Sequence, residues 1–199
     1  MNFLAHLWLA EHSGTSLAGS ILGDVVRGAD LSAYPDDIAH GIRLHRRVDA
    51  LTDRHPALHA SRAAFAAGHR RYAGIVLDLI ADHALSRDWP RHAQEPLTVF
   101  CARAGAAIAA AAPWFAQAGG RASDAAGFAA LLDSYNEASG IDRAIARTAR
   151  RLRDPAPLLA AGRDWRTHLP AVRAALPTLL GDLLAAMRSD AVSSARTMR

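Results

Sequence analysis

The chain has 199 residues, of which 51% are hydrophobic and 21% are charged, a balance typical of one globular domain with a sizeable core. Its basic side chains are all arginine, and the formal net charge is +4. This modest excess suits an acidic or phosphorylated partner without choosing among nucleic acid, protein and small ligand. The single cysteine, Cys101, excludes an intrachain disulfide and indicates a reducing, cytoplasmic setting.

Neither a signal peptide nor a membrane span is expected. The segment 1–8 has no basic residue ahead of its apolar side chains, and His6 interrupts it. No stretch reaches the roughly 18 uncharged apolar residues that a membrane span needs. The Ala-rich run 102–112 is too short and carries Arg103.

The residue pattern predicts an all-α fold, because strand-like alternation is absent and Ala, Leu and Arg dominate. We expect a single-domain helical bundle over residues 1–187 and a disordered basic tail over 188–199. In chain order, helices are predicted over 2–11, from a Thr15 or Ser16 cap to 26, from Pro35 through 53, from Pro56 to 68, over 72–86 and 96–112, over 124–135 with Ser123 as cap, over 141–153 after Gly140, and over 163–187 with interruptions at Pro170 and Pro177. A restart at Pro113, a loop at Gly119–Gly120 and a turn at Pro155–Pro157 separate them.

The segment 41–53 combines charge and apolar character on one predicted helix. His45 and Asp49 lie one turn apart, on a face that continues through Ile38 and Ile42. A charged group on a half-buried face needs a partner, and a metal ion is one such partner. An ordinary ion pair between residues one turn apart is the alternative.

Other polar residues also interrupt apolar helical patterns. Asp78 and Asp82 share a face of the helix 72–86, with His83 about 100° away, and two like charges one turn apart call for a metal or an arginine nearby. Asp24 follows Gly23, where it could bind a metal or cap the backbone. His6 is either a ligand or a core histidine.

Carboxylates and imidazoles on neighbouring helices are the usual materials of a divalent metal site in an all-α protein. Without thiolates, they suit Mn²⁺ or Mg²⁺ better than structural zinc. Such a site could polarise a phosphoryl oxygen and lower the pKa of a bound water. The candidate ligands are Asp24, His45, Asp49, Asp78, Asp82, His83 and His6, and the candidate phosphate-binding residues are Arg27, Arg46 and Arg47. The arginine run 143–153 is either a solvated face or a surface for an acidic partner.

Four segments in order resemble the acyl carrier protein phosphodiesterase family, also called ACP hydrolase. They are Asn2-Phe-Leu-Ala-His-Leu7, Gly23-Asp-Val-Val-Arg-Gly28, Gly41-Ile-Arg-Leu-His-Arg-Arg-Val-Asp49 with Thr52-Asp53, and Asp82-His-Ala-Leu-Ser-Arg-Asp-Trp89. The segment 140–151 is similar more loosely. The resemblance covers most of the chain and is sharpest over 2–89. It implies an all-α fold distantly related to the HD-domain phosphohydrolases, although Asp82-His83 reverses their usual His-Asp order.

The resemblance also implies an activity: removal of 4′-phosphopantetheine from holo-acyl carrier protein, a strongly acidic partner, with a divalent metal that is typically Mn²⁺. Asp24 is then the residue expected to be essential, His45 and Arg46 would join it in catalysis, and the other candidates would bind or support the metal. No nucleic acid partner is expected. Two alternatives stay open: an HD-type hydrolase of a nucleotide such as a guanosine polyphosphate, and a non-enzymatic basic adaptor whose polar clusters are buried salt bridges.

Overall fold

The computed structural model describes the backbone of residues 1–197 and the side chains of residues 1–188, and this part of the chain contains helices and no strand. The all-α prediction is confirmed. The helices are α1 (Phe3–His12), α2 (Leu17–Leu22), α3 (Asp36–Arg54), α4 (Pro56–Ala63), η1 (Ala67–His69), α5 (Arg70–Arg87), η2 (Trp89–Arg91), α6 (Leu97–Ala110), α7 (Ala112–Gln117), α8 (Ala125–Asp133), η3 (Ser134–Asn136), α9 (Ala138–Ala149), α10 (Ala156–Gly162) and α11 (Trp165–Thr197).

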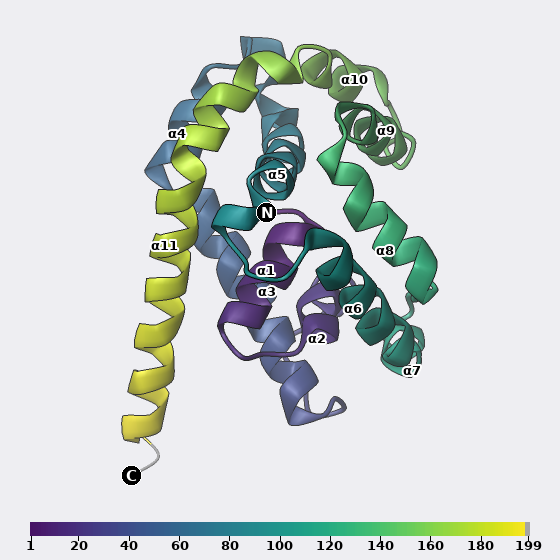
Figure 1. The fold of residues 1–199 in the computed structure, drawn as a ribbon, viewed down its shortest axis with the longest axis vertical. Helices are drawn as coiled ribbons and strands as arrows, with labels where there is room; N and C mark the ends of the chain where they lie inside the picture. Colours follow the sequence, from purple (N-terminus) through teal and green to yellow (C-terminus); the bar gives the residue numbers. More distant parts are fainter. Residues whose placement is uncertain (198–199) are drawn as a thin grey trace.

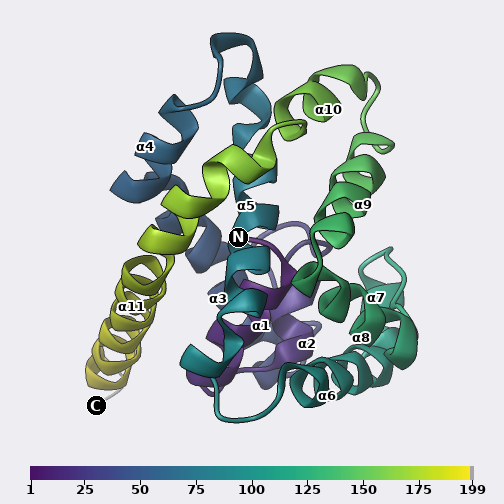
Figure 2. The same ribbon diagram turned by 45° about the horizontal axis from the view of Figure 1, so that its top comes forward.

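Helix α5 forms the centre of the bundle. Its residues Ala73, Val76, Ile80, Ala84 and Leu85 have no exposed surface, so the helix is buried on several sides. Helices α1, α4, α9, α10 and α11 all pack against it (Figures 1 and 2). The N-terminus lies beside α5 in both views, so the start of α1 is held in the interior of the bundle.

Helices α2 and α3 cross with their backbones in contact. A Cβ atom on Gly19 would lie 2.5 Å from the carbonyl oxygen of Ile38, and one on Gly41 would lie 2.7 Å from Cα of Gly19. Any larger residue at either position would therefore force the helices apart. The contact therefore sets how closely α2, and the turn with Asp24 that follows it, lies against α3.

The helix starts follow the predicted chemistry, with one change. The hydroxyl of Ser16 accepts a hydrogen bond from the amide of Gly19 at 3.2 Å, which makes Ser16 the cap of α2. Helix α3 has Asp36 and Asp37 in its first turn, where the helix dipole favours negative charge. The cap of α8 is Asp124 and not Ser123, because the Asp124 carboxylate accepts from the amide of Gly127 at 2.8 Å.

Three predicted boundaries in the C-terminal half were wrong. Gly140 lies inside α9, where a side chain would meet the carbonyl oxygen of Ser134 at 1.7 Å, so a packing constraint explains this glycine. The predicted turn at Pro155–Pro157 is the start of α10. Pro170 and Pro177 do not interrupt α11: both lie on its exposed face, where water can satisfy the carbonyls left unpaired, and the helix curves around the bundle (Figure 1).

Helix α11 also extends beyond its predicted end near Met187. Its backbone is helical to Thr197, so the tail predicted as disordered is helical as far as the structure describes it, and residues 198–199 lie outside the described residues. Its segment Trp165–Arg188 is long and apolar enough to cross a membrane by length and composition, which the sequence analysis did not anticipate. Core helices of soluble proteins pass the same criterion, although only 28% of the apolar window in this segment is buried. The helix packs on α5 and α4 and buries Val172, Leu176 and Leu183.

Candidate metal centre

Side chains from α1, from α3 and from the turn that follows α2 meet in one place. Nε2 of His6 lies 3.1 Å from Oδ1 of Asp49, and Nε2 of His45 lies 3.2 Å from Oδ2 of the same carboxylate. Oδ1 of Asp24 lies 3.4 Å from Nε2 of His45. The two imidazole rings stack with their centroids 4.0 Å apart. Each of His6, His45 and Asp49 offers a ligand atom within 4.8 Å of the other two. We call His6, His45, Asp49 and Asp24 the His–Asp cluster.

The local sequence explains how the cluster is assembled. His45 and Asp49 are one turn apart on α3, as predicted, and His45 is buried beside Ile42 and Val48. Gly23 makes room for the imidazole ring, because a Cβ atom there would lie 2.3 Å from Cγ of His45. Asp24 therefore meets His45 directly and does not serve as the backbone cap that spacing alone allowed.

The two histidines have opposite protonation properties. Burial lowers the pKa of His45, but hydrogen bonds and charges from Asp24 and Asp49 outweigh it and raise that pKa to about 9. Burial, with the nearby positive charge of His45, lowers the pKa of His6 to about 4. Although burial opposes it, contact with both histidines holds the pKa of Asp49 far below its usual range. The two carboxylates thus attract positive charge into a half-buried site.

The positive group that the sequence predicts near Asp78 and Asp82 is the amino group of Met1 among the described residues, and not an arginine. Asp78 Oδ1 lies 3.2 Å from the amino group of Met1, which also approaches Oδ1 of Asp49 at 3.7 Å. Asp82 is completely buried and accepts hydrogen bonds from the amides of Leu4 at 2.7 Å and Ala5 at 3.0 Å. It therefore caps the first turn of α1, although α1 belongs to a distant part of the chain.

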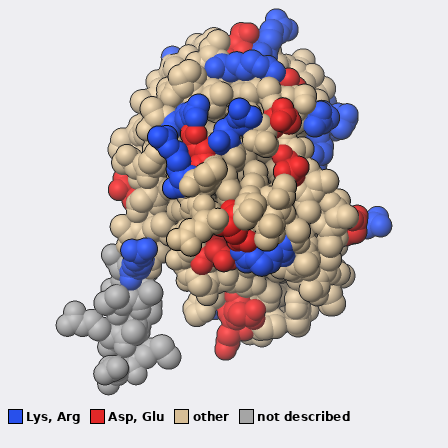
Figure 3. All heavy atoms as spheres, viewed as in Figure 1, with Lys and Arg blue, Asp and Glu red and all other residues tan. Residues whose placement is uncertain are grey.

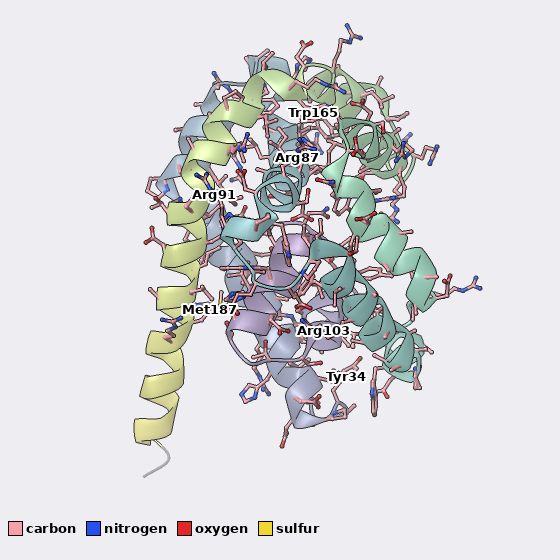
Figure 4. All side chains as sticks on the ribbon, viewed as in Figure 1. Tyr34, Arg87, Arg91, Arg103, Trp165 and Met187 are labelled. Atoms are coloured by element: carbon pink, nitrogen blue, oxygen red, sulfur yellow. The ribbon has the colours of Figure 1, made fainter. Side chains whose placement is uncertain are left out.

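The structure does not bring His83 into the His–Asp cluster. Its Nδ1 lies 2.7 Å from the carbonyl oxygen of Tyr135, and its ring meets the edge of Trp165 at a centroid distance of 5.2 Å. Trp165 is labelled in Figure 4 where α11 begins, and its Nε1 donates to Asp142 at 2.8 Å. His83 thus joins α5 to η3 and α11.

Of the three arginines predicted to bind phosphate, Arg46 has a structural contact instead: its Nη2 donates to the carbonyl oxygen of Val26 at 2.9 Å, which fixes the loop after α2. Arg27 and Arg47 are exposed. None of the three lines the cavity beside the cluster, as far as the structure describes that cavity.

That cavity has a volume of about 770 Å³ and opens beside Asp24 and Asp78. Its lining residues come from α1, α2 and each α-helix from α5 to α9, and from the segments between them. Three arginines contribute: Arg121 in the loop before α8, Arg147 on α9 and Arg151 after that helix. Sequence analysis missed these arginines as site residues, although the run 143–153 was noted as a surface for an acidic partner. A groove of about 820 Å³ lies along α11 near Trp8 and Asp88, but it contains no member of the His–Asp cluster.

The structure is an all-helical bundle with imidazole and carboxylate groups at the edge of a cavity, an arrangement whose residue types could hold a divalent cation. A family model described as acyl carrier protein phosphodiesterase matches residues 1–183, and the chain belongs to that family. Relatives named acyl carrier protein phosphodiesterase include one from Salmonella dublin, 45% identical over 114 residues, which is 57% of this chain and 59% of the relative.

Those from Salmonella agona (strain SL483) and Salmonella newport (strain SL254) are each 44% identical over 114 residues, with the same 57% and 59% coverage. The alignment therefore covers less than two thirds of these relatives' length. No solved structure matches the chain, and the likeness to HD-domain proteins stays a prediction.

Proposed function

We propose that this protein hydrolyses the phosphodiester between 4′-phosphopantetheine and a serine of holo-acyl carrier protein, with Mn²⁺ or Mg²⁺ as cofactor. The observation that carries the proposal is the His–Asp cluster at the edge of the cavity, in a chain whose relatives bear that name. The products would be apo-acyl carrier protein and free 4′-phosphopantetheine.

The residues of the cluster fit a divalent cation. Two imidazole nitrogens and a carboxylate have ligand atoms within 4.8 Å of one another, and the Asp24 carboxylate adjoins His45. Imidazole with carboxylate suits Mn²⁺, whereas Mg²⁺ prefers oxygen ligands alone. Asp24 and Asp49 raise the pKa of His45, so the site favours positive charge, and a bound cation would replace the proton on that imidazole. Nδ1 of His45 is buried without a hydrogen-bond partner in the described part of the chain, unlike most metal-bound histidines.

His6, His45 and Asp49 would hold the cation, and Asp24 would complete the set from the cavity side. When bound, the cation would supply Lewis-acid polarisation of a phosphoryl oxygen. Asp24 is the most exposed member, with 53% of its side-chain surface accessible, whereas His45 retains 4%. Asp24 is thus the group that can also contact substrate or water in the cavity, which agrees with its expected essential role.

The test is mass spectrometry of holo-acyl carrier protein incubated with the protein and Mn²⁺. We expect the carrier protein to lose the mass of the prosthetic group, with free 4′-phosphopantetheine as product. Asp24→Asn should slow this reaction by at least about 100-fold, because it removes a carboxylate from the cluster. Asp30→Asn is the matched control: Asp30 is an exposed loop residue that accepts from the amide of Ser32.

Two results would contradict the proposal. One is an unchanged carrier protein together with hydrolysis of guanosine polyphosphate, which would support the nucleotide hydrolase. The other is stable binding of the carrier protein without any loss of mass, which would support the adaptor. Equal rates for Asp24→Asn and wild type would show that the site has been placed wrongly.

A further inference from the structure

Three arginines reach the cavity from two separate segments. Arg121 belongs to the loop before α8, Arg147 to the last turn of α9, and Arg151 follows that helix directly. Within the part of the chain that the structure describes, none of the three forms an ion pair with a carboxylate. In the same range Arg62, Arg103, Arg166 and Arg173 all do. Asp24 and Asp78 also line the cavity, but they contact His45 and the amino group of Met1 respectively. The three arginines therefore remain available to an anionic ligand.

Apolar side chains line the cavity together with these arginines. Val25, Ile75, Phe128 and Leu131 line the same cavity, and Asp24 connects it to the His–Asp cluster. A volume of about 770 Å³ is in the range of pockets that bury a ligand of several tens of atoms. An apolar lining with a few cationic groups suits a flexible, mostly uncharged molecule that carries one anionic end.

We propose that the cavity binds the phosphopantetheine arm, with Arg121, Arg147 and Arg151 contacting its phosphate and the apolar lining contacting the rest of the arm. The assignment rests on the proposed function, which supplies the arm as ligand. Guanidinium groups are the preferred partners of phosphate oxygens because they donate two parallel hydrogen bonds. The cavity's continuity with Asp24 would place a phosphate held there next to the candidate metal centre.

The same helix offers a control for simple charge attraction. Arg143 and Arg150 line a separate hollow of about 310 Å³ on the neighbouring side of α9, and Arg147 borders both spaces. Blue arginine side chains are visible over α9 at the upper right of Figure 3. Replacing Arg150 removes the same charge as replacing Arg151, at the adjacent position, without touching the cavity.

The test is calorimetric titration of the metal-free protein with free 4′-phosphopantetheine and, separately, with pantetheine, which lacks the phosphate. In Arg147→Met/Arg151→Met the affinity for 4′-phosphopantetheine should fall at least about 10-fold, since two charge-assisted contacts are lost. The affinity for pantetheine should not change. Arg150→Met should bind both ligands as wild type does. Leu131→Trp, which narrows the apolar part of the cavity, should lower the affinity for both ligands.

Circular dichroism melting verifies that each variant is folded. If Arg147 is needed for folding, Arg121→Met, which changes an exposed loop residue, is the alternative variant for the same test. The proposal is overturned if Arg121→Met and the double variant bind 4′-phosphopantetheine as tightly as wild type. It is also overturned if Arg150→Met weakens the binding of 4′-phosphopantetheine as much as Arg147→Met/Arg151→Met does. A third contrary result is a double variant that raises the KM for holo-carrier protein but binds the free arm normally, because the arginines would then contact the carrier protein. Binding of the free arm by a protein that never hydrolyses holo-carrier protein would refute the proposed function alone.

Discussion

At the scale of single residues, Gly23 controls the position of His45. A Cβ atom at residue 23 would lie between 2.3 and 2.5 Å from three atoms of His45, which is closer than real Cβ contacts allow. The backbone of Gly23 is right-handed helical, with φ −53° and ψ −31°, so any L residue could adopt it. The glycine is therefore needed for space and not for backbone conformation.

Gly23→Ala should consequently disturb the metal centre through a steric clash. We expect the affinity for Mn²⁺ and the hydrolytic rate to fall by at least about 10-fold, because the imidazole must leave its position between Asp24 and Asp49. Calorimetric Mn²⁺ titration and the carrier protein assay measure the two effects. Gly68→Ala is the control, since nothing lies within 4 Å of a Cβ there. Indistinguishable results for the two variants would show that His45 does not depend on this space.

At the scale of elements, α1 is positioned by α5. Asp82 on α5 accepts hydrogen bonds from the amides of Leu4 and Ala5, and His6 follows directly in the same helical turn. Asp82 thus supports the cluster through the placement of α1, whereas the sequence analysis expected it to bind metal. Burial raises the pKa of Asp82 to about 7, although the two amide donors act in the opposite direction.

This pKa predicts a pH dependence of folding. Between the ordinary value of 3.8 and about 7, the folded protein binds a proton at Asp82 that the unfolded chain has released. The free energy of unfolding should therefore fall as pH rises through this window. The side chain of Asp82→Asn cannot titrate. Over the same pH range, the free energy of unfolding should therefore fall by about 1–3 kcal/mol more in wild type than in Asp82→Asn. Urea unfolding of the metal-free proteins measures both slopes, and parallel slopes would contradict the prediction.

At the scale of the whole molecule, sequence pattern predicted what depends on short spacings. The helix register of His45 and Asp49, the Ser16 cap and the all-α class follow from residues a few positions apart. Contacts across the bundle were not predictable in this way. The adjacency of Asp82 to His83 suggested a shared site, but one side chain caps α1 and the other contacts Tyr135.

The arginines of the cavity show the same limit. Arg121 is separated from Arg147 by α8, and only the folded bundle places both on one cavity beside Asp24. Arg46 shows the reverse case. Its neighbours in the sequence suggested phosphate binding, but in the structure its guanidinium donates a hydrogen bond to the carbonyl oxygen of Val26. Long-range packing decides which polar residues face the cavity. The helical periodicity of the sequence does not reveal which residues these are.

We propose that His6, His45, Asp49 and Asp24 together bind a divalent cation. Electron paramagnetic resonance of Mn²⁺ titrated into the protein measures that binding. We expect saturable binding in wild type and an affinity at least about 10-fold lower in Asp49→Ala. Asp53→Ala should keep wild-type affinity, because the Asp53 carboxylate, one turn further on, is exposed and pairs with Arg62 at 2.7 Å. Equal affinity in wild type and Asp49→Ala, or loss of binding in Asp53→Ala alone, would contradict the proposal.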